Sequence, residues 1–138
     1  MLARPIQCLI ETGVYADDLD QAERFYRDVL GLAVHAREPG RHVFFKVGDA
    51  DVLLIFRPQA TQQGDRLPAH AAHGPGHFAL GIAREDVSAW RDRLIEKGVP
   101  IEHEEDWPSG GHSLYFRDPA GNLVELITPA VWGLPSGW

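Results

Sequence analysis

Three ionisable residues lie inside segments that otherwise have the composition of buried β-strands. Glu11 lies in CLIETGVYA, His77 in GHFALGIA and Glu125 in NLVELI. Because strand side chains alternate between faces, Glu125 shares a face with Leu123 and Ile127, and both faces of that strand are otherwise apolar. An ionised carboxylate there must be paired with a cation, hydrogen-bonded or bound to a metal, since burial without a partner forces protonation or costs stability.

Each of these residues also has a purely structural explanation. Glu125 could form a salt bridge with an arginine, Glu11 could be a charge at a sheet edge, and His77 could be a hydrogen-bonded core histidine. However, the next residues on the same strand face are small, Gly13 after Glu11 and Ala79 after His77, which leaves room for a ligand. Their matched positions favour a shared functional site.

The elements that must position these residues occur twice along the chain, as hydrophobic periodicity and turn residues indicate. The predicted elements are a strand at 8–16, a helix at 17–31, strands at 32–38, 42–48 and 51–58, a strand at 76–83, a helix at 84–98, and strands at 99–105, 112–118 and 122–128. Asp17 or Asp18 is the expected N-cap of the first helix, and Gly31 its stop. Aligning the two halves puts Leu54 opposite Glu125.

The whole chain, 1–138, is predicted to be a single domain, because 44% hydrophobic and 24% charged residues are typical of one globular core. Module 1 covers about 6–58, a linker 59–75, module 2 about 76–129 and a C-terminal tail 130–138. The polar linker is either a connection or an active-site lid. Its histidines, His70 and His73, are either exposed to solvent or reach the pocket from that lid.

Charge and cysteine content exclude several classes of function. The formal net charge is −7 and no Lys/Arg cluster could neutralise a row of phosphates, so we expect no nucleic-acid partner. The sequence shows no signal peptide and no run of transmembrane length, which predicts a cytoplasmic protein without a membrane partner. The single cysteine, Cys8, cannot form an internal disulfide and is interpreted as a small core residue.

The duplicated order, together with DDLDQAERFYRDVLGL, GHFALGI and SLYFRDPAGNLVELITP, resembles the vicinal oxygen chelate superfamily. That superfamily includes glyoxalase I, fosfomycin-resistance proteins, extradiol dioxygenases and bleomycin-binding proteins. The resemblance covers about residues 7–129. It implies an α+β fold in which two tandem β-α-β-β-β modules form a partly open curled sheet around a divalent metal, as in the glyoxalase/bleomycin resistance/dihydroxybiphenyl dioxygenase-like fold.

By motif position, the resemblance places the metal ligands at Glu11, His77 and Glu125. A fourth possible position falls on Leu54, which cannot bind a metal. One imidazole and two carboxylates suit Mn²⁺, Fe²⁺, Ni²⁺ or Zn²⁺. Because members of the superfamily often exchange modules between subunits, a homodimer is expected, with Glu11 supplied by the same or the partner subunit.

The function that the resemblance implies is that of a glyoxalase-like lyase or isomerase acting on a small substrate with vicinal oxygens. The metal would act as a Lewis acid, and Glu125 or Glu11 would move the proton as general base. Ser113 and Tyr115 are candidates for hydrogen bonds to substrate oxygens. Arg117 could reach a substrate carboxylate or could instead belong to the tight turn in FRDPAGN.

Three alternatives share this scaffold. An extradiol-type dioxygenase would need a further acid/base imidazole, for which His112 is the candidate, although its direction depends on the phase of its strand. A fosfomycin-resistance-like thiol transferase would need basic residues for the phosphonate, where this chain has Glu105 and Leu134. A non-catalytic drug-binding protein is the third alternative, and the retention of three metal ligands argues against it.

Overall fold

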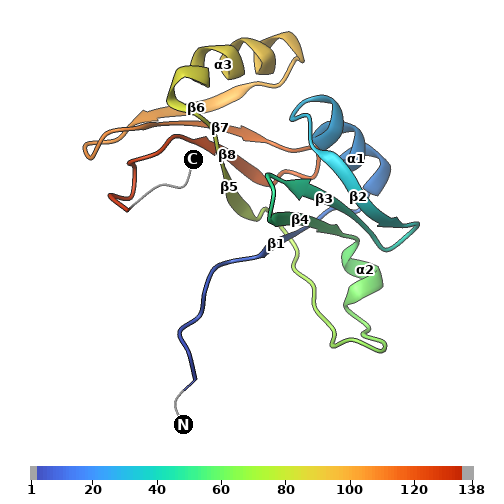
Figure 1. Ribbon diagram of the computed structural model, residues 1–138. Helices are drawn as coiled ribbons and strands as arrows, with labels where there is room; N and C mark the ends of the chain where they lie inside the picture. The colour runs from blue at the N-terminus through green and yellow to red at the C-terminus, as the bar shows by residue number, and fades with distance from the viewer. Residues whose placement is uncertain (1–2, 135–138) are drawn as a thin grey trace.

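The computed structural model describes residues 3–134 and folds as two copies of one module (Figure 1). The elements are β1 (Glu11–Tyr15), α1 (Leu19–Asp28), β2 (Ala33–Glu38), β3 (His42–Val47), β4 (Asp51–Phe56), α2 (Pro58–Thr61), β5 (His77–Gly81), the 3-10 helix η1 (Arg84–Asp86), α3 (Val87–Glu96), β6 (Ile101–Asp106), β7 (His112–Arg117) and β8 (Leu123–Ile127). The predicted order of strand, helix and three strands is confirmed in both halves. The short helix α2, at the start of the linker, was not predicted, and residues 135–138 of the predicted tail lie outside the described residues.

Each module forms a four-stranded mixed sheet, and the two sheets have the same topology. The strand orders are β1-β4-β3-β2 and β5-β8-β7-β6, with the first strand of each module parallel to the last. Both sheets have a register shift at the equivalent place, in β2 and in β6. The predicted α+β duplication is therefore confirmed down to the position of the β-bulge.

The register also confirms the alignment of the two halves. Gly13 on β1 pairs with Leu54 on β4, and Ala79 on β5 pairs with Glu125 on β8. Leu54 therefore occupies in the first sheet the place that Glu125 occupies in the second.

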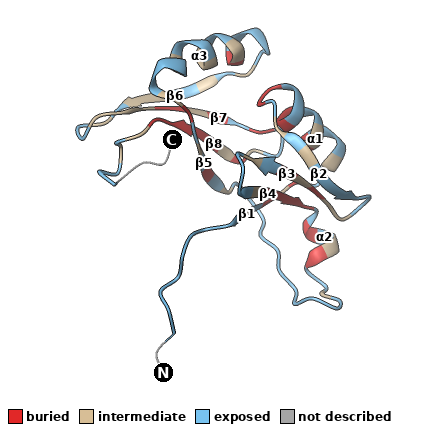
Figure 2. Cartoon of the chain, viewed as in Figure 1, coloured by how far each residue is buried: buried red, intermediate tan, exposed pale blue. Residues whose placement is uncertain are grey.

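The helices pack the two modules into one core. Asp18 is the N-cap of α1, accepting a hydrogen bond from the Gln21 amide at 2.9 Å, which satisfies one of the free N–H groups at the start of the helix. The buried face of α1 carries Phe25, whose ring centroid lies 6.3 Å from that of Phe116 in the second module. Buried residues lie in the strands other than the edge strands β2 and β6 and on the inner faces of the helices, whereas the outer helix surfaces are exposed (Figure 2). The helix side of both sheets thus shares one core.

The N-terminal segment differs from the prediction. The first strand begins at Glu11 rather than at residue 8, because its partner strand β4 begins only at Asp51, and the segment before Glu11 projects away from both sheets (Figure 1). Cys8 lies in that segment and is exposed, so its assignment to the core is wrong. Within residues 3–134, no helix combines the length and the hydropathy needed to span a membrane.

Candidate functional site

Strand pairing places several predicted site residues of the second module on one sheet face. Glu125 pairs with Ala79 on β5 and with Tyr115 on β7, and partners in register share a face. His77 and Ser113 each lie two residues further along those strands and therefore point to the same side. The alternating residues of these strands point into the core instead.

His77 and Glu125 form the centre of this face. The Nε2 atom of His77 lies 3.3 Å from Oε1 of Glu125, and the His77 side chain is half exposed whereas that of Glu125 is only 7% exposed. The Nδ1 atom of His77 lies 2.9 Å from the backbone carbonyl oxygen of Leu123. Because a carbonyl only accepts, Nδ1 carries the proton, and in the neutral ring Nε2 presents its lone pair to the Glu125 carboxylate.

Two acceptor atoms that face each other in this way require a positive charge between them, either a proton or a metal ion. Two ligand atoms that each lie about 2.1 Å from one ion are about 3.0 Å apart at a right angle and about 3.4 Å apart at the tetrahedral angle. The separation of 3.3 Å between Nε2 and Oε1 falls within that interval. The pair His77 and Glu125 therefore fits two adjacent ligand positions of a divalent metal.

The second oxygen of Glu125 is held from behind. The Ser113 hydroxyl donates to Oε2 of Glu125 at 2.6 Å and accepts from the indole N–H of Trp107 at 2.9 Å. Ser113 is fully buried. The Ser113 hydroxyl, a predicted candidate for substrate contact, thus lies behind the carboxylate and leaves Oε1 to face His77.

Tyr115 lies beside Glu125 on the same face, and His103 lies beyond Tyr115. The ring centroid of Tyr115 lies 6.4 Å from that of His77 and 5.9 Å from that of His103. Burial, and then the negative charge of Glu125, raise the pKa of the Tyr115 phenol, so that it remains a hydrogen-bond donor at neutral pH. Nε2 of His103 lies 2.7 Å from Oε2 of Glu105. This face therefore carries a second imidazole within reach of a ligand at the tyrosine.

Sequence reasoning missed both His103 and Trp107. Strict alternation would put His103 on the same face as Ile101, which packs against the core, but the register shift between these two residues turns His103 to the opposite face. Trp107 follows β6 in the hairpin turn, where periodicity carries no signal. The only clue in the sequence was the need of the buried Glu125 for a donor.

Two further candidates have partners elsewhere. Arg117 donates to both carboxylate oxygens of Glu102, at 2.7 and 3.1 Å, and to the Gly121 carbonyl at 3.2 Å, which corresponds to the turn interpretation. Nε2 of His112 lies 2.7 Å from Oε1 of Glu104. Since the neighbouring Ser113 points to Glu125, His112 faces the opposite side of β7, away from the site.

The third predicted ligand lies on the other sheet. Glu11 is exposed at the start of β1, where it pairs with Val52. Among residues 3–134, no three His, Cys, Asp or Glu side chains come together in a group that could hold a metal. One chain therefore brings together two of the three predicted ligands, and Glu11 is not among them.

The equivalent face of the first sheet is aromatic. The Phe56 ring lies 5.4 Å from Phe44, 6.0 Å from His42 and 4.6 Å from His70, measured between centroids. Nδ1 of His70 also lies 2.7 Å from the Tyr15 hydroxyl. The linker is thus attached to the first module by His70 and packs against the aromatic cluster.

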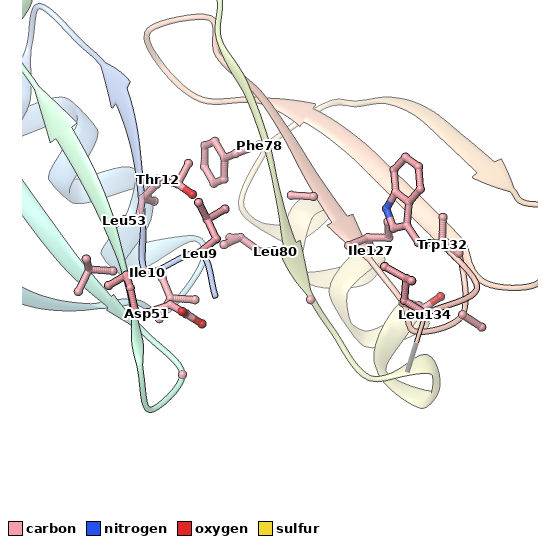
Figure 3. A pocket seen from close by; sticks show the side chains of 18 residues that line it. Leu9, Ile10, Thr12, Asp51, Leu53, Phe78, Leu80, Ile127, Trp132 and Leu134 are labelled. Carbon is pink, nitrogen blue, oxygen red and sulfur yellow. The ribbon is translucent and has the colours of Figure 1, made fainter. Parts of the chain in front are cut away.

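A cavity of about 610 Å³ lies between β1 and β5 (Figure 3). Its lining is mostly apolar and includes Leu9, Ile10 and Trp132, but neither His77 nor Glu125. Leu9 is 79% exposed and Trp132 80% exposed. The cavity is therefore an open apolar surface beside the candidate site rather than the site itself.

Known proteins with this arrangement identify the family. Residues 9–126 match the Glyoxalase/Bleomycin resistance protein/Dioxygenase superfamily. The crystal structure of a lactoylglutathione lyase from Agrobacterium tumefaciens is 44% identical, with a TM-score of 0.90 over 95% of this chain and 100% of the other. Glutathione transferase FosA from Serratia marcescens is 31% identical over 121 residues, 88% of this chain and 80% of that protein. Biphenyl-2,3-diol 1,2-dioxygenase 3 from Rhodococcus globerulus is 32% identical over 113 residues, which is 80% of this chain but 57% of that protein. Because the family match spans both modules, the chain belongs to the Glyoxalase/Bleomycin resistance protein/Dioxygenase superfamily, as its motifs predict.

Proposed function

We propose that the protein is a divalent-metal-dependent lyase or isomerase of the glyoxalase type, acting on a small substrate with vicinal oxygens. The observation that carries the proposal is the pairing of His77 Nε2 with Glu125 Oε1 at 3.3 Å, with both side chains fixed from behind. The similarity to the lactoylglutathione lyase structure, at 44% identity over nearly the whole chain, supports this reaction class over the others.

The third ligand in this proposal is Glu11 of a second copy of the chain. β1 and β5 are edge strands of their sheets and carry Glu11 and His77, so in this proposal the edge of one chain lies beside the edge of another. The apolar lining of the cavity between β1 and β5, with Leu9 and Trp132 largely exposed, is the kind of surface that a homodimer buries. The cytoplasmic location stays a prediction.

When bound, the metal supplies a Lewis acid that polarises two neighbouring substrate oxygens. His77 and Glu125 would hold the ion, and the Tyr115 phenol would donate a hydrogen bond to a substrate oxygen. Glu11, partly released from the metal, would act as the general base, because both oxygens of Glu125 are engaged by Ser113 and His77, whereas Glu11 is exposed. It would take a proton from one oxygen-bearing carbon and return it to its neighbour.

Local contacts bear on two of the alternatives. For oxygen chemistry, His112 is directed away from the site, although His103 offers an imidazole on the correct face. For phosphonate binding, the Arg117 guanidinium is already paired with Glu102, and Glu105 adds negative charge to the same face. An extradiol dioxygenase is therefore the second candidate, favoured by His103 and by the similarity to the biphenyl-diol dioxygenase.

Metal analysis of protein purified without chelator tests the proposed site. We expect about one divalent ion per chain in the wild type and a strong loss in His77→Ala, whereas His35→Ala, an exposed histidine on β2, keeps the metal. Equal metal content in the wild type and His77→Ala would contradict the site. A loss of metal content in both His77→Ala and His35→Ala would point to nonspecific surface binding.

A substrate panel tests the reaction class. Hemithioacetals of 2-oxoaldehydes, catechols, and fosfomycin with a thiol are each incubated with Mn²⁺, Fe²⁺, Ni²⁺ or Zn²⁺ while substrate loss and oxygen uptake are followed. We expect isomerisation of a hemithioacetal without oxygen uptake, lost in Glu11→Gln. Catechol-dependent oxygen uptake with Fe²⁺ would establish the dioxygenase instead, and recovery of every compound intact would favour a binding protein.

A further inference from the structure

A chain of hydrogen bonds ends at the carboxylate of Glu125. The indole N–H of Trp107 donates to the Ser113 hydroxyl at 2.9 Å, and that hydroxyl donates to Oε2 of Glu125 at 2.6 Å. The serine is fully buried and the carboxylate nearly so. These groups form a relay that begins in the β6–β7 hairpin and reaches the candidate metal ligand on β8.

The chemistry of the groups fixes the direction of this relay. An indole N–H can only donate, so the Ser113 oxygen must accept from Trp107. The single hydroxyl proton of Ser113 is then directed to Glu125, and a hydrogen bond to a charged acceptor is the stronger kind. Without the indole, the serine hydroxyl could rotate. When the indole donates to the hydroxyl, the hydroxyl proton points to Oε2 of Glu125 and holds that oxygen in one place.

The hairpin that carries Trp107 is itself anchored to the residue that follows β8. The Trp107 amide donates to the Gly111 carbonyl at 3.1 Å, and the His112 amide donates to the Thr128 hydroxyl at 2.8 Å. Gly111 has a φ of +91°, and a Cβ atom there would lie 2.6 Å from Cγ2 of Val131, so the close approach requires glycine. The indole is therefore presented by a rigid turn rather than by a free loop.

We propose that Trp107 is a positioning residue for the metal, acting through Ser113 on Glu125. By holding Oε2, it leaves Oε1 of Glu125 beside Nε2 of His77, the two atoms that would hold the ion. This inference rests on the proposed function, since it assumes that His77 and Glu125 hold a metal. It adds that a residue outside the strands orients a carboxylate that would hold the metal.

Metal affinity tests the relay. Titration calorimetry with Mn²⁺ alone is performed on the wild type, Trp107→Phe, Ser113→Ala and the double variant. Removal of a group that orients a metal ligand typically weakens binding about 10- to 100-fold, and we expect Ser113→Ala in that range and Trp107→Phe near its lower end. Because Trp107 acts only through Ser113, the double variant should bind no more weakly than Ser113→Ala alone.

Trp90→Phe is the matched control, because Trp90 lies on α3, where its ring is 5.8 Å from Cζ of Arg93, away from the site. It should bind Mn²⁺ as the wild type does. Thermal melting of the metal-free proteins shows whether each variant folds. If Trp107→Phe does not fold, Ser113→Ala tests the same relay. In the metal-free wild type, the Trp107 indole proton should exchange slowly with water in NMR spectra, and faster in Ser113→Ala.

The outcomes separate the two proposals. Wild-type affinity in Trp107→Phe, or losses in the two single variants that multiply in the double variant, would overturn the relay while leaving the metal site intact. Wild-type protein that binds none of Mn²⁺, Fe²⁺, Ni²⁺ and Zn²⁺ would overturn the proposed function and the relay with it. Weaker binding in Trp107→Phe together with a normal Trp90→Phe supports the positioning role.

Discussion

Replacing Glu125 by glutamine should abolish metal binding without destabilising the metal-free protein. In Glu125→Gln, the side-chain carbonyl oxygen can still accept from Ser113, which leaves the amide N–H₂ where Oε1 lies, 3.3 Å from His77 Nε2. Nε2 of His77 is an acceptor, because Nδ1 of the same ring donates to the Leu123 carbonyl. Two acceptors that oppose each other thus become a donor and an acceptor.

The magnitudes follow from these contacts. A new hydrogen bond contributes about 1 kcal/mol, and a charge that is nearly buried is removed, so the metal-free variant should be as stable as the wild type or more stable by about 1 kcal/mol. For a chain of 138 residues, the unfolding entropy is about 0.3 kcal/mol/K, so about 1 kcal/mol corresponds to a Tm change of about 3 °C. Mn²⁺ at about 100 times its Kd stabilises a binding protein by about 2.7 kcal/mol, a shift of about 9 °C.

The assay is thermal unfolding at pH 8 with and without Mn²⁺, since most histidines are neutral at that pH. We expect a metal-dependent shift in the wild type and none in Glu125→Gln. Glu105→Gln is the control, because Glu105 lies on the same face but pairs with His103. The reasoning is refuted if metal-free Glu125→Gln melts more than about 6 °C below the wild type, or if it keeps the wild-type response to Mn²⁺.

Two predictions concern the framework around the site. Tyr26→Phe removes a buried hydroxyl that donates to Asp118 at 2.7 Å across the two modules. The substitution should lower the free energy of unfolding, measured by urea titration, by about 1.5–3 kcal/mol. A loss below about 0.5 kcal/mol would contradict this contribution. For His112, burial alone would lower the pKa, but hydrogen bonds with Asp106 and Glu104 and their charges outweigh it and raise the pKa. The stabilisation by His112 is therefore complete below the ordinary histidine pKa and is lost as the pH rises through the pKa of His112 in the folded protein. His112→Gln should thus cost more stability at pH 6 than at pH 8.5. An equal cost at both pH values would be inconsistent with a raised pKa.

Several features followed from the sequence because their causes are local. Asp18 as N-cap and Gly31 in a left-handed conformation, with a φ of +72°, bound the first helix through the geometry of its own backbone. The matched order of elements in the two halves predicts that Leu54 lies opposite Glu125, and the strand register confirms it. The pairing of His77 with Glu125 could also be predicted, since first and last strands of a module are neighbours in this family.

Other features required the tertiary structure because their causes lie in distant pairings. The segment around Cys8 has a strand-like composition, yet β4 offers no partner before Asp51, so the cysteine is exposed. A bulge in β6 reversed the face of His103, and no alternation rule includes a bulge that the paired strand imposes.

At the centre of the site, too, some features are properties of the sequence and others depend on the tertiary structure. The types of Glu11, His77 and Glu125 and their places on strands are properties of the sequence, and they are enough to predict a metal. Which side chains meet depends on packing: the helix sides of both sheets share one core, so the face with His77 and Glu125 and the edge with Glu11 remain separate in one chain. Folding brings Trp107 and Ser113 behind Glu125, because a buried carboxylate needs donors and only the folded hairpin supplies them.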